Sequence, residues 1–300
     1  MPESDVARRA ARLPAEDGGM RPQQQEPPGL TGPMDPVPDH GEETWTGRGR
    51  LTGLKALVTG GDSGIGRAVA IAYAREGADV ALNYLPEEEQ DARDTARWIE
   101  EAGRTAVLVP GDLRDEETCG RIVERAVEGL GGLNILVNNA GYHWARGEAG
   151  LKGLRTEDLE RAVRTNLYGT LWTTRAALPH LGRGDCIINT TSLQAYQPSV
   201  TMVDYAATKA ALNNVTANLA AELGPEGIRV NAVAPGPVWT PLQPATKEPE
   251  AVAKMGRDTP LGRIGQPAEL AGAYVFLASP DEASYVSGTV LGVTGGLPVF

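Results

Sequence analysis

The chain has 300 residues, and its 28 lysines and arginines against 39 acidic residues give a formal net charge of −11. A phosphate backbone would be repelled by this charge, so nucleic-acid binding is not expected as the main role. The sequence contains neither the roughly 20 consecutive apolar residues of a membrane span nor the apolar core of a signal peptide, so we expect a cytoplasmic protein without a membrane partner. Cys119 and Cys186 are the only cysteines and the histidines lack ligand spacing, which argues against a disulfide scaffold and against a metal site.

The first 50 residues are rich in proline and almost lack β-branched and aromatic residues. Such a segment buries too little apolar area to offset the entropy lost on ordering. We therefore predict a flexible N-terminal extension over 1–50, followed by one catalytic domain over 51–300. The alternative for Pro36–Arg50, which includes Trp45, is an extended arm that docks on a neighbouring surface or on another subunit.

From Leu51 onward, short apolar runs alternate with longer segments of helical period, which is typical of repeated βα units around a parallel sheet. Strands are expected at Ala56–Thr59, Val80–Asn83, Ala106–Val109, Ile135–Asn138, Ile187–Thr191, Arg229–Val233 and Val290–Val293. Helices are expected at Ile65–Arg75, Glu87–Glu101, Glu116–Glu128, Thr156–Leu178, Tyr205–Leu223 and Ala268–Leu277. The pattern predicts a single-domain α/β Rossmann fold, with a seven-stranded parallel sheet doubly wound by helices on both faces.

The segment Thr59–Gly66 follows the first expected strand and precedes a helix. Its glycines, spaced GxxxGxG, would let the backbone turn tightly and approach a pyrophosphate, whose charge the amino end of the helix stabilises. The alternative is a tight strand-to-helix turn without a ligand. The cofactor-binding residues expected here are Gly60, Asp62, Ser63, Gly64, Ile65 and Gly66.

The end of the second strand is expected to lie beside the adenosine ribose of a bound dinucleotide. A carboxylate there would favour NAD and repel the 2′-phosphate of NADP, but the sequence has Asn83, Tyr84 and Leu85. NADP(H) is therefore the predicted cofactor, and NAD(H) is also permitted. Arg67 on the first helix is the cation considered for the phosphate.

Two further strand ends carry residues suited to a dinucleotide. Asp112 and Leu113 follow the third strand, where Asp112 can accept from the adenine amino group; its alternative is an ordinary turn residue. Asn139, Ala140 and Gly141 follow the fourth strand, where small residues let a cofactor lie against the backbone. The alternative at this second position is a plain asparagine-rich turn.

Ser192 follows the fifth strand, and Tyr205 and Lys209 stand four residues apart on an expected helix, where both side chains share one face. Each residue also has a plain interpretation, as a strand-end serine, a half-buried tyrosine and a surface lysine. Their order along the chain and their position after the glycine motif favour a joint role.

Together these segments resemble the short-chain dehydrogenase/reductase family over residues 51–296. Thr59–Gly66 is similar to its TGxxxGxG motif, Asn138–Gly141 to its NNAG motif, and Ser192 with Tyr205–Lys209 to its serine and YxxxK motif. Asn166 is similar to the asparagine that the family carries on a helix.

The resemblance extends to the segment Pro235–Thr240, from which Pro235, Gly236, Val238 and Thr240 are expected to contact the cofactor. The segments Pro38–Glu42 and Asn83–Glu89 resemble a bacterial subgroup with N-terminal extensions, described as general stress proteins or NADP-dependent aldehyde reductases.

The resemblance implies an NAD(P)-dependent oxidoreductase that transfers hydride between nicotinamide C4 and a carbonyl or alcohol carbon. Tyr205 would be the general acid/base, because Lys209 and the oxidised nicotinamide would lower the pKa of its phenol. Ser192 would hold the substrate oxygen. Asn166 would keep a water beside Lys209 as a proton relay; the alternative is a buried asparagine bonded to backbone.

The substrate pocket is expected to be lined by His143, Trp144, Gln194 and Trp239, with a lid at Pro241–Asp258. The aromatic rings suit an apolar carbonyl compound, whereas Gln194 suits a hydroxylated one. We expect no catalytic role for His143, because proton transfer is already assigned to Tyr205.

The sequence thus predicts an NADPH-preferring reductase of aldehydes or ketones. The first alternative is a sugar or polyol dehydrogenase that uses NAD or NADP. A non-enzymatic dinucleotide sensor is disfavoured because Asn166, Ser192, Tyr205 and Lys209 are all present. The family commonly assembles as homotetramers, here through the helices that start near Thr156 and Tyr205 and through the last strand, so a homotetramer is implied.

Overall fold

The computed structural model describes residues 19–145 and 150–300. Within these residues, seven parallel strands form one sheet in the order β3-β2-β1-β4-β5-β6-β7. The strands are β1 (Lys55–Thr59), β2 (Asp79–Tyr84), β3 (Ala106–Pro110), β4 (Ile135–Asn138), β5 (Cys186–Thr190), β6 (Arg229–Pro235) and β7 (Val290–Val293). The predicted doubly wound parallel sheet is confirmed, and each predicted strand overlaps the observed one.

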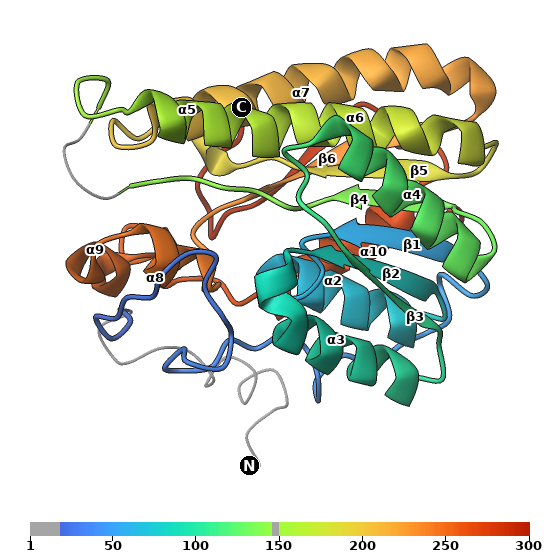
Figure 1. Cartoon of the computed structure of the whole chain (residues 1–300), viewed down its shortest axis with the longest axis horizontal. Helices are drawn as coiled ribbons and strands as arrows, with labels where there is room; N and C mark the ends of the chain where they lie inside the picture. The colour runs from blue at the N-terminus through green and yellow to red at the C-terminus, as the bar shows by residue number, and fades with distance from the viewer. Residues whose placement is uncertain (1–18, 146–149) are drawn as a thin grey trace.

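Helices cover both faces of the sheet (Figure 1). One face carries α2 (Gly64–Arg75), α3 (Glu89–Glu101) and α10 (Ala268–Ala278). The other carries α4 (Glu116–Leu130), α5 (Thr156–Val163), α6 (Gly169–Ala177) and α7 (Val203–Leu223). Two short helices, α8 (Leu242–Thr246) and α9 (Pro249–Lys254), follow β6.

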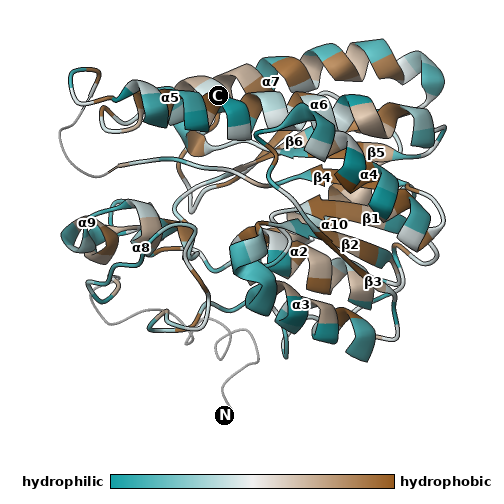
Figure 2. Cartoon of the chain, viewed as in Figure 1, coloured by the Kyte–Doolittle hydropathy of each residue, from teal (hydrophilic) through white to brown (hydrophobic). Residues whose placement is uncertain are grey.

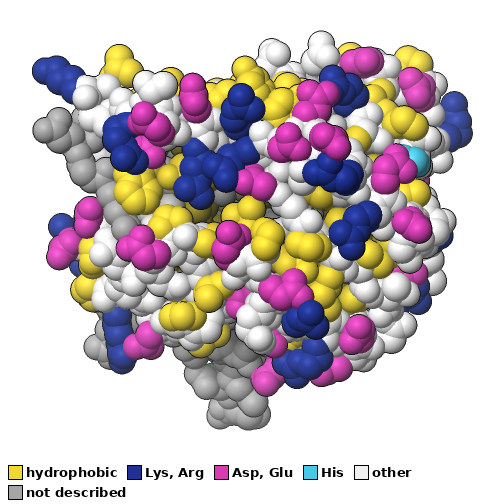
Figure 3. Space-filling view, in the orientation of Figure 1, with side chains coloured by type: hydrophobic (Ala, Val, Ile, Leu, Met, Phe, Trp, Pro, Cys, Tyr) yellow, Lys and Arg dark blue, Asp and Glu magenta, His cyan; other side chains and the backbone are white. Residues whose placement is uncertain are grey.

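Two hydrophobic cores result from the alternation of side chains along each strand. Val80 and Leu82 of β2 pack under α2 and α3, while Ala81 between them faces the core under α4. Figure 2 shows the same division, with brown strands at the centre and teal outer surfaces on α3 and α5. Acidic and basic side chains are interspersed over the face seen in Figure 3, so neither charge dominates that face.

Residues 19–145 and 150–300 contain neither a membrane-spanning helix nor a cluster of metal-ligating side chains. None of the helices there is long and apolar enough to cross a membrane. The same residues include no group of three or more histidine, cysteine, aspartate or glutamate side chains arranged to hold a metal ion.

The segment Thr156–Leu178, predicted as one helix, contains an irregular turn. A π-helical turn at Arg164–Tyr168 separates α5 from α6. Such a turn adds one residue to a helical turn, a shift too small to disturb the hydrophobic period from which the helix was predicted. It lies around the predicted site residue Asn166, which is fully buried.

The prediction of a flexible extension over 1–50 does not describe residues Gly19–Arg50, which we call the arm; residues 1–18 lie outside the described part of the chain. The arm forms no helix or strand, yet it packs on the domain, and Met20, Thr31, Met34 and His40 are buried. Its own composition is poor in apolar residues, but the surface on which it docks supplies the missing partners. Local composition therefore underestimated its order.

Glu76, at the end of α2, fixes the last residues of the arm. Its buried carboxylate accepts hydrogen bonds from Trp45 Nε1 at 3.1 Å, from the N–H groups of Arg48 and Arg50 at 2.9 and 3.2 Å, and from Arg50 Nη2 at 2.6 Å. Burial opposes ionisation, but the bonds from Arg50 and Arg48 outweigh it and lower the pKa of Glu76 to about 2. This carboxylate thus joins the arm to the sheet domain.

Glu76→Gln is expected to lower the free energy of unfolding by about 3 kcal/mol, because buried donors lose their anionic acceptor. Urea unfolding measures the loss. Glu282→Gln is the matched control: it removes a half-exposed carboxylate 3.7 Å from the same Arg50, and should change stability by less than about 0.5 kcal/mol. Equal losses in both variants would contradict the role given to Glu76.

The stabilisation by Glu76 should also depend on pH with a definite sign. Its pKa is lower in the folded protein than the ordinary value of 4.5. The stabilisation is therefore complete above that ordinary value and is lost as the pH falls from it toward 2. The stability difference between wild type and Glu76→Gln should shrink over this interval.

Candidate active site

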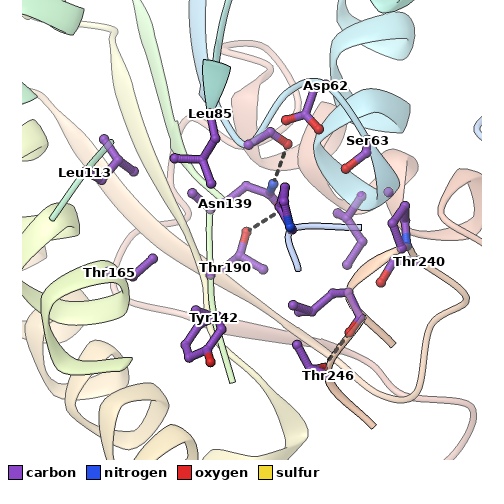
Figure 4. A pocket seen from close by; sticks show the side chains of 18 of the residues that line it. Asp62, Ser63, Leu85, Leu113, Asn139, Tyr142, Thr165, Thr190, Thr240 and Thr246 are labelled. Carbon is purple, nitrogen blue, oxygen red and sulfur yellow. Dashed lines mark hydrogen bonds between the residues drawn. The ribbon is translucent and has the colours of Figure 1, made fainter. Parts of the chain in front are cut away.

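One cleft lies at the carboxyl ends of the strands, and most of the predicted site residues line it. Side chains from the glycine loop, from the loops after β2 and β4, and from the segment after β6 face the same cavity (Figure 4). The predicted residues on its wall are Gly60, Asp62, Ser63, Gly64, Ile65, Asn83, Tyr84, Leu85, Asp112, Leu113, Asn139, Ala140, Gly141, Ser192, Tyr205, Lys209, Pro235, Gly236, Val238 and Thr240. The fold thus brings the expected cofactor residues and the expected proton-transfer residues together.

The glycine loop between β1 and α2 has the geometry that a pyrophosphate needs. Gly60 and Gly64 adopt positive φ angles of 60° and 50°, which other residues rarely adopt. A Cβ on Gly66 would lie 1.8 Å from the carbonyl oxygen of Gly60, so α2 starts in direct contact with the turn. Ser63 is the N-cap residue, but its side chain makes no capping hydrogen bond. The bare backbone at the amino end of α2 therefore fits the diphosphate of a dinucleotide.

The β2 end of the cleft is more acidic than the sequence indicated. Asp62 and Glu88 both line it. Asp62 is 1% exposed, and its Oδ2 atom has no hydrogen-bond partner among the described residues. Glu88 accepts a hydrogen bond from the N–H of Leu85 at 2.9 Å. Arg67, the cation considered for a 2′-phosphate, is instead held by Glu42 at 3.1 Å.

Burial is the main cause of a raised pKa at both of these carboxyls. At Asp62, nearby Asp91 adds to the effect, and a hydrogen bond from Ser63 opposes it. At Glu88, the negative charge of Asp62 adds to it. Both carboxyls therefore hold their protons at a higher pH than an exposed carboxyl does. Glu88 was not predicted as a site residue, because its glutamate-rich segment has the composition of a solvated turn.

Hydrogen bonds tie the end of β1 to the end of β4. Thr59 Oγ1 accepts from the N–H groups of Asn139 and Ala140 at 2.9 and 3.1 Å. In return, Asn139 Nδ2 donates to the carbonyl oxygens of Thr59 and Gly60 at 3.0 and 3.1 Å. Asn138 adds a bond from Nδ2 to Asn189 Oδ1 of β5 at 3.0 Å. The asparagine side chains therefore link neighbouring strands at this edge of the sheet.

Ser192, Tyr205 and Lys209 meet on the opposite wall of the cleft. Lys209 Nζ donates to the carbonyl oxygen of Thr190 at 2.7 Å and lies 5.5 Å from the centroid of the Tyr205 ring. Ser192 Oγ accepts from the N–H of Gln194 at 3.1 Å. The end of β5 and one face of α7 therefore place a hydroxyl, a phenol and an amine together.

Burial acts in opposite directions on the two titratable groups of this wall. It raises the pKa of Tyr205, against a smaller lowering by a hydrogen bond with Ser192. It lowers the pKa of Lys209 to about 8. The expected lowering of the Tyr205 pKa by the Lys209 ammonium is absent, and desolvation outweighs the lowering by the Ser192 hydrogen bond.

Asn166 lies next to this wall and is fully engaged in hydrogen bonds. Its Nδ2 donates to the carbonyl oxygen of Tyr142 at 2.9 Å and to Thr208 Oγ1 at 3.0 Å, while its Oδ1 accepts from the N–H of Tyr142 at 2.8 Å. These bonds correspond to the alternative considered above, in which Asn166 is a buried asparagine that forms hydrogen bonds with the backbone. The side chain thereby joins the segment after β4 to α7.

The side chains of two predicted cofactor residues also form hydrogen bonds with nearby groups of the chain. Asp112 accepts from the N–H of Arg114 at 2.9 Å and from its Nε at 2.8 Å, as an ordinary turn aspartate does. Asn83 Nδ2 donates to the carbonyl oxygens of Val109 and Gly111 at 3.1 and 3.0 Å. Both residues line the cleft while these bonds hold its shape.

The four predicted substrate residues are not among those that line the cleft. Trp239 is fully buried, and its Nε1 donates to the carbonyl oxygen of Pro36 in the arm at 2.7 Å. His143 is also buried, packs edge-on against Tyr205 with ring centroids 5.3 Å apart, and bonds Thr246. Gln194 Oε1 accepts from the N–H of Ser199 at 2.6 Å. Trp144 lies in the same segment as His143, beyond the cleft wall.

Burial, with smaller contributions from Lys247 and Lys209, holds the pKa of His143 well below its ordinary value. The ring is therefore neutral at physiological pH.

Several lining residues had no clear signal in the sequence. Pro27 and Pro28 of the arm, Tyr142 and Arg161 contribute to the wall. The two prolines lie in the segment predicted to be flexible, and Tyr142 and Arg161 belong to no recognised motif. Only the NNAG motif directly before Tyr142 could have indicated its position.

The comparisons with known proteins agree with this geometry. A family model described as enoyl-(acyl carrier protein) reductase matches residues 60–298. General stress protein 39 of Bacillus subtilis (strain 168) is 49% identical, over 91% of this chain and 94% of its own. NADPH-dependent aldehyde reductase 1, a chloroplastic protein of Arabidopsis thaliana, is 41% identical, over 92% of this chain and 97% of its own.

Solved structures are similar to this chain in fold as well as in sequence. A short-chain dehydrogenase from Burkholderia cenocepacia J2315, crystallised in complex with NADP, superposes with a TM-score of 0.77 at 38% identity, over 83% of this chain and 99% of the other. With the glycine loop, the serine and the YxxxK pair in one cleft, these matches show that the chain belongs to the short-chain dehydrogenase/reductase family of NAD(P)-dependent oxidoreductases.

Proposed function

We propose that this protein reduces an aldehyde or a ketone with a reduced nicotinamide dinucleotide as the hydride donor. The observation that carries the proposal is that Ser192, Tyr205 and Lys209 lie on the wall of the cleft that also contains the glycine loop. The relative named NADPH-dependent aldehyde reductase 1 supports this substrate class. The bound cofactor would supply the hydride, and the chain's own residues would position the carbonyl and protonate its oxygen.

Tyr205 is the proposed general acid. Its phenol, with an ordinary pKa of 10 that burial raises further, carries its proton at neutral pH and can donate it to the oxygen on which negative charge develops. Ser192 would donate a second hydrogen bond to that oxygen and hold the carbonyl carbon in position. Hydride and proton arrive at different atoms, carbon and oxygen, which balances the reduction to an alcohol.

Lys209 is proposed to stabilise Tyr205 in its deprotonated form. Its pKa of about 8 leaves the ammonium largely charged at neutral pH, and this charge stabilises the phenolate that forms when Tyr205 gives up its proton. The bond to the Thr190 carbonyl fixes the amine beside the ring. Asn166 would act here as a positioning residue, because its bonds connect Tyr142 to α7.

The proposed cofactor would lie along the cleft, with its adenosine at one end and its nicotinamide at the other. The diphosphate would lie on the loop from Gly60 to Gly66, and the adenosine beside Leu85 and Leu113. The nicotinamide would lie near the segment Pro235–Thr240, next to the proton donors. This order places the reacting ring where the β4, β5 and β6 ends meet.

We further propose that NADP(H) is the preferred cofactor while Asp62 and Glu88 carry their protons. Position 84 holds a tyrosine, not an acid, and the raised pKa values of the two carboxyls limit repulsion of a 2′-phosphate at neutral pH. Once ionised, the same two groups would oppose that phosphate and favour NAD(H).

Self-association is also proposed. The outer faces of α5, the π-helical turn and α6 expose Leu159, Tyr168 and Leu171, and a shallow apolar groove between α6 and α7 is lined by Tyr168, Leu171, Trp172 and Leu219. A homotetramer would cover these side chains. A monomeric molar mass in light scattering at micromolar concentration would contradict it.

Tyr205→Phe is expected to lower kcat for carbonyl reduction by about a hundredfold to ten-thousandfold, because the proton donor is removed. The dissociation constant for NADPH, measured by its fluorescence, should change by less than about threefold, since the ring remains. Tyr196→Phe, at a tyrosine nearby in the chain, is the matched control and should keep wild-type kcat. Turnover retained by Tyr205→Phe would overturn the mechanism.

The cofactor preference should depend on pH. As the pH rises through about 7 and then through about 9, first Asp62 and then Glu88 lose their protons, and the ratio of kcat/KM for NADPH to that for NADH should fall. The ratio, unlike either rate alone, does not report the titration of Tyr205 or Lys209, which act on both cofactors.

Glu88→Gln should flatten this pH dependence and keep the ratio high, because the amide oxygen can still accept from Leu85 without becoming charged. Glu87→Gln, at the exposed neighbour, is the control and should follow wild type. A ratio that does not change with pH in wild type would contradict the proposed role of the acidic pair.

A further inference from the structure

The arm connects two parts of the molecule that lie on either side of the cleft. In Figure 1 its blue trace runs beside α8 and α9 before it reaches β1. One set of its contacts is with the segment after β6, and another is with α3. Both sets involve buried atoms, so residues 20–34 of the arm are fixed at two separated places, in addition to the bonds of its last residues to Glu76.

On the β6 side, the arm completes a small hydrophobic cluster. Met20 and Met34 pack with Trp239, Val252 and Ile264, all of them buried. The N–H of Gln25 donates to the carbonyl oxygen of Pro244 in α8 at 2.9 Å.

The approach of the arm to α8 is close at Gly29. This residue has a positive φ of 85°, and a Cβ on it would lie 2.7 Å from the carbonyl oxygen of Pro241. Only glycine allows the arm to pass at this distance.

On the α3 side, a buried hydrogen bond holds the arm. The N–H of Thr31 donates to Asp91 Oδ2 at 2.7 Å, and the two residues are 5% exposed each. A bond from an amide to a buried carboxylate is among the stronger hydrogen bonds in proteins.

Between these two attachments, Pro27 and Pro28 line the cleft together with Asp62, Leu85 and Glu88. They therefore face the end at which the adenosine ribose is proposed to bind. Proline rings present apolar surface without an N–H group, and two in succession have little freedom to move aside. The cleft thus has an outer wall that the sheet and its helices do not supply.

We propose that residues 25–31 of the arm form this outer wall of the cofactor site and control the release of the cofactor. The proposal rests on the proposed function, since it requires the dinucleotide to lie between the glycine loop and the arm. A ligand under such a segment leaves only after one of its attachments opens. The Thr31–Asp91 bond, at the α3 end, is the attachment that opens, because it is a hydrogen bond, whereas Met20 and Met34 on either side of it in the chain are held in the hydrophobic cluster.

Two variants of the full-length protein open this end in different ways. Asp91→Ala removes the acceptor, and Thr31→Pro removes the donor but keeps the carboxylate. Asp91→Asn is the matched control, because its amide oxygen still accepts from Thr31 while its charge is gone. Comparison of the three separates the loss of the bond from the effect of the Asp91 charge on Asp62.

The test measures the rate of NADPH dissociation by stopped-flow fluorescence, with excess NADP⁺ as the competitor. Hydrogen exchange of the peptide that covers residues 25–34, with and without NADPH, reports whether the arm is closed. Asp91→Ala and Thr31→Pro should raise the dissociation rate by about tenfold and lose the protection that NADPH gives this peptide. Asp91→Asn should resemble wild type in both readouts.

Unchanged dissociation rates in Asp91→Ala and Thr31→Pro, despite faster exchange in the arm, would overturn the inference and leave the proposed function intact. Equal exchange of the wild-type arm with and without NADPH would also overturn it. If wild type does not bind NADPH at all, the proposed function fails, and this inference fails with it.

Discussion

The site depends on the hydrogen bonds between the ends of β1 and β4. The strand order reverses at this point, with β2 and β3 on one side and β5, β6 and β7 on the other, so the connecting segments leave in opposite directions and open a cleft. Thr59 and Asn139 close the gap between the two strands through backbone and side-chain bonds. The glycine loop on one side and the segment after β4 on the other are thereby held in fixed positions.

Buried polar and charged groups surround this point, and those on the wall of Tyr205 have hydrogen-bond partners. Lys209 is held by the Thr190 carbonyl, and Asn166 by the Tyr142 backbone, so the wall that carries Tyr205 is rigid before any ligand binds. By contrast, Asp62 keeps an oxygen without a partner among the described residues. A buried oxygen of this kind costs free energy unless a ligand or a proton satisfies it, which is consistent with a ligand site at the β2 end.

The sequence predicted the parts of the molecule that are encoded by local pattern. The strands follow from short apolar runs, and the glycine loop, the serine and the YxxxK pair lie on the wall of one cleft as expected. Features that arise from contacts distant in the chain were not visible. The arm is ordered by residues far along the chain, such as Asp91, which lies 60 positions from Thr31, and Trp239 is held by a hydrogen bond to Pro36 of the arm. Glu88 lies on the cleft wall and accepts a hydrogen bond from the N–H of Leu85, and amino-acid composition alone does not indicate this position.

We propose that the chemistry takes place where the ends of β4, β5 and β6 meet, and that a segment outside the sheet covers the cofactor. Hydride would move within this cleft onto a carbonyl carbon. A direct test uses NADPH deuterated at the transferable C4 position with a panel of aldehydes and ketones, followed by mass spectrometry of the alcohol product. The expected result is one deuterium on the carbinol carbon for each NADPH oxidised. Oxidation of NADPH without deuterium in the alcohol, or no oxidation with any member of the panel while NADPH binds, would contradict it.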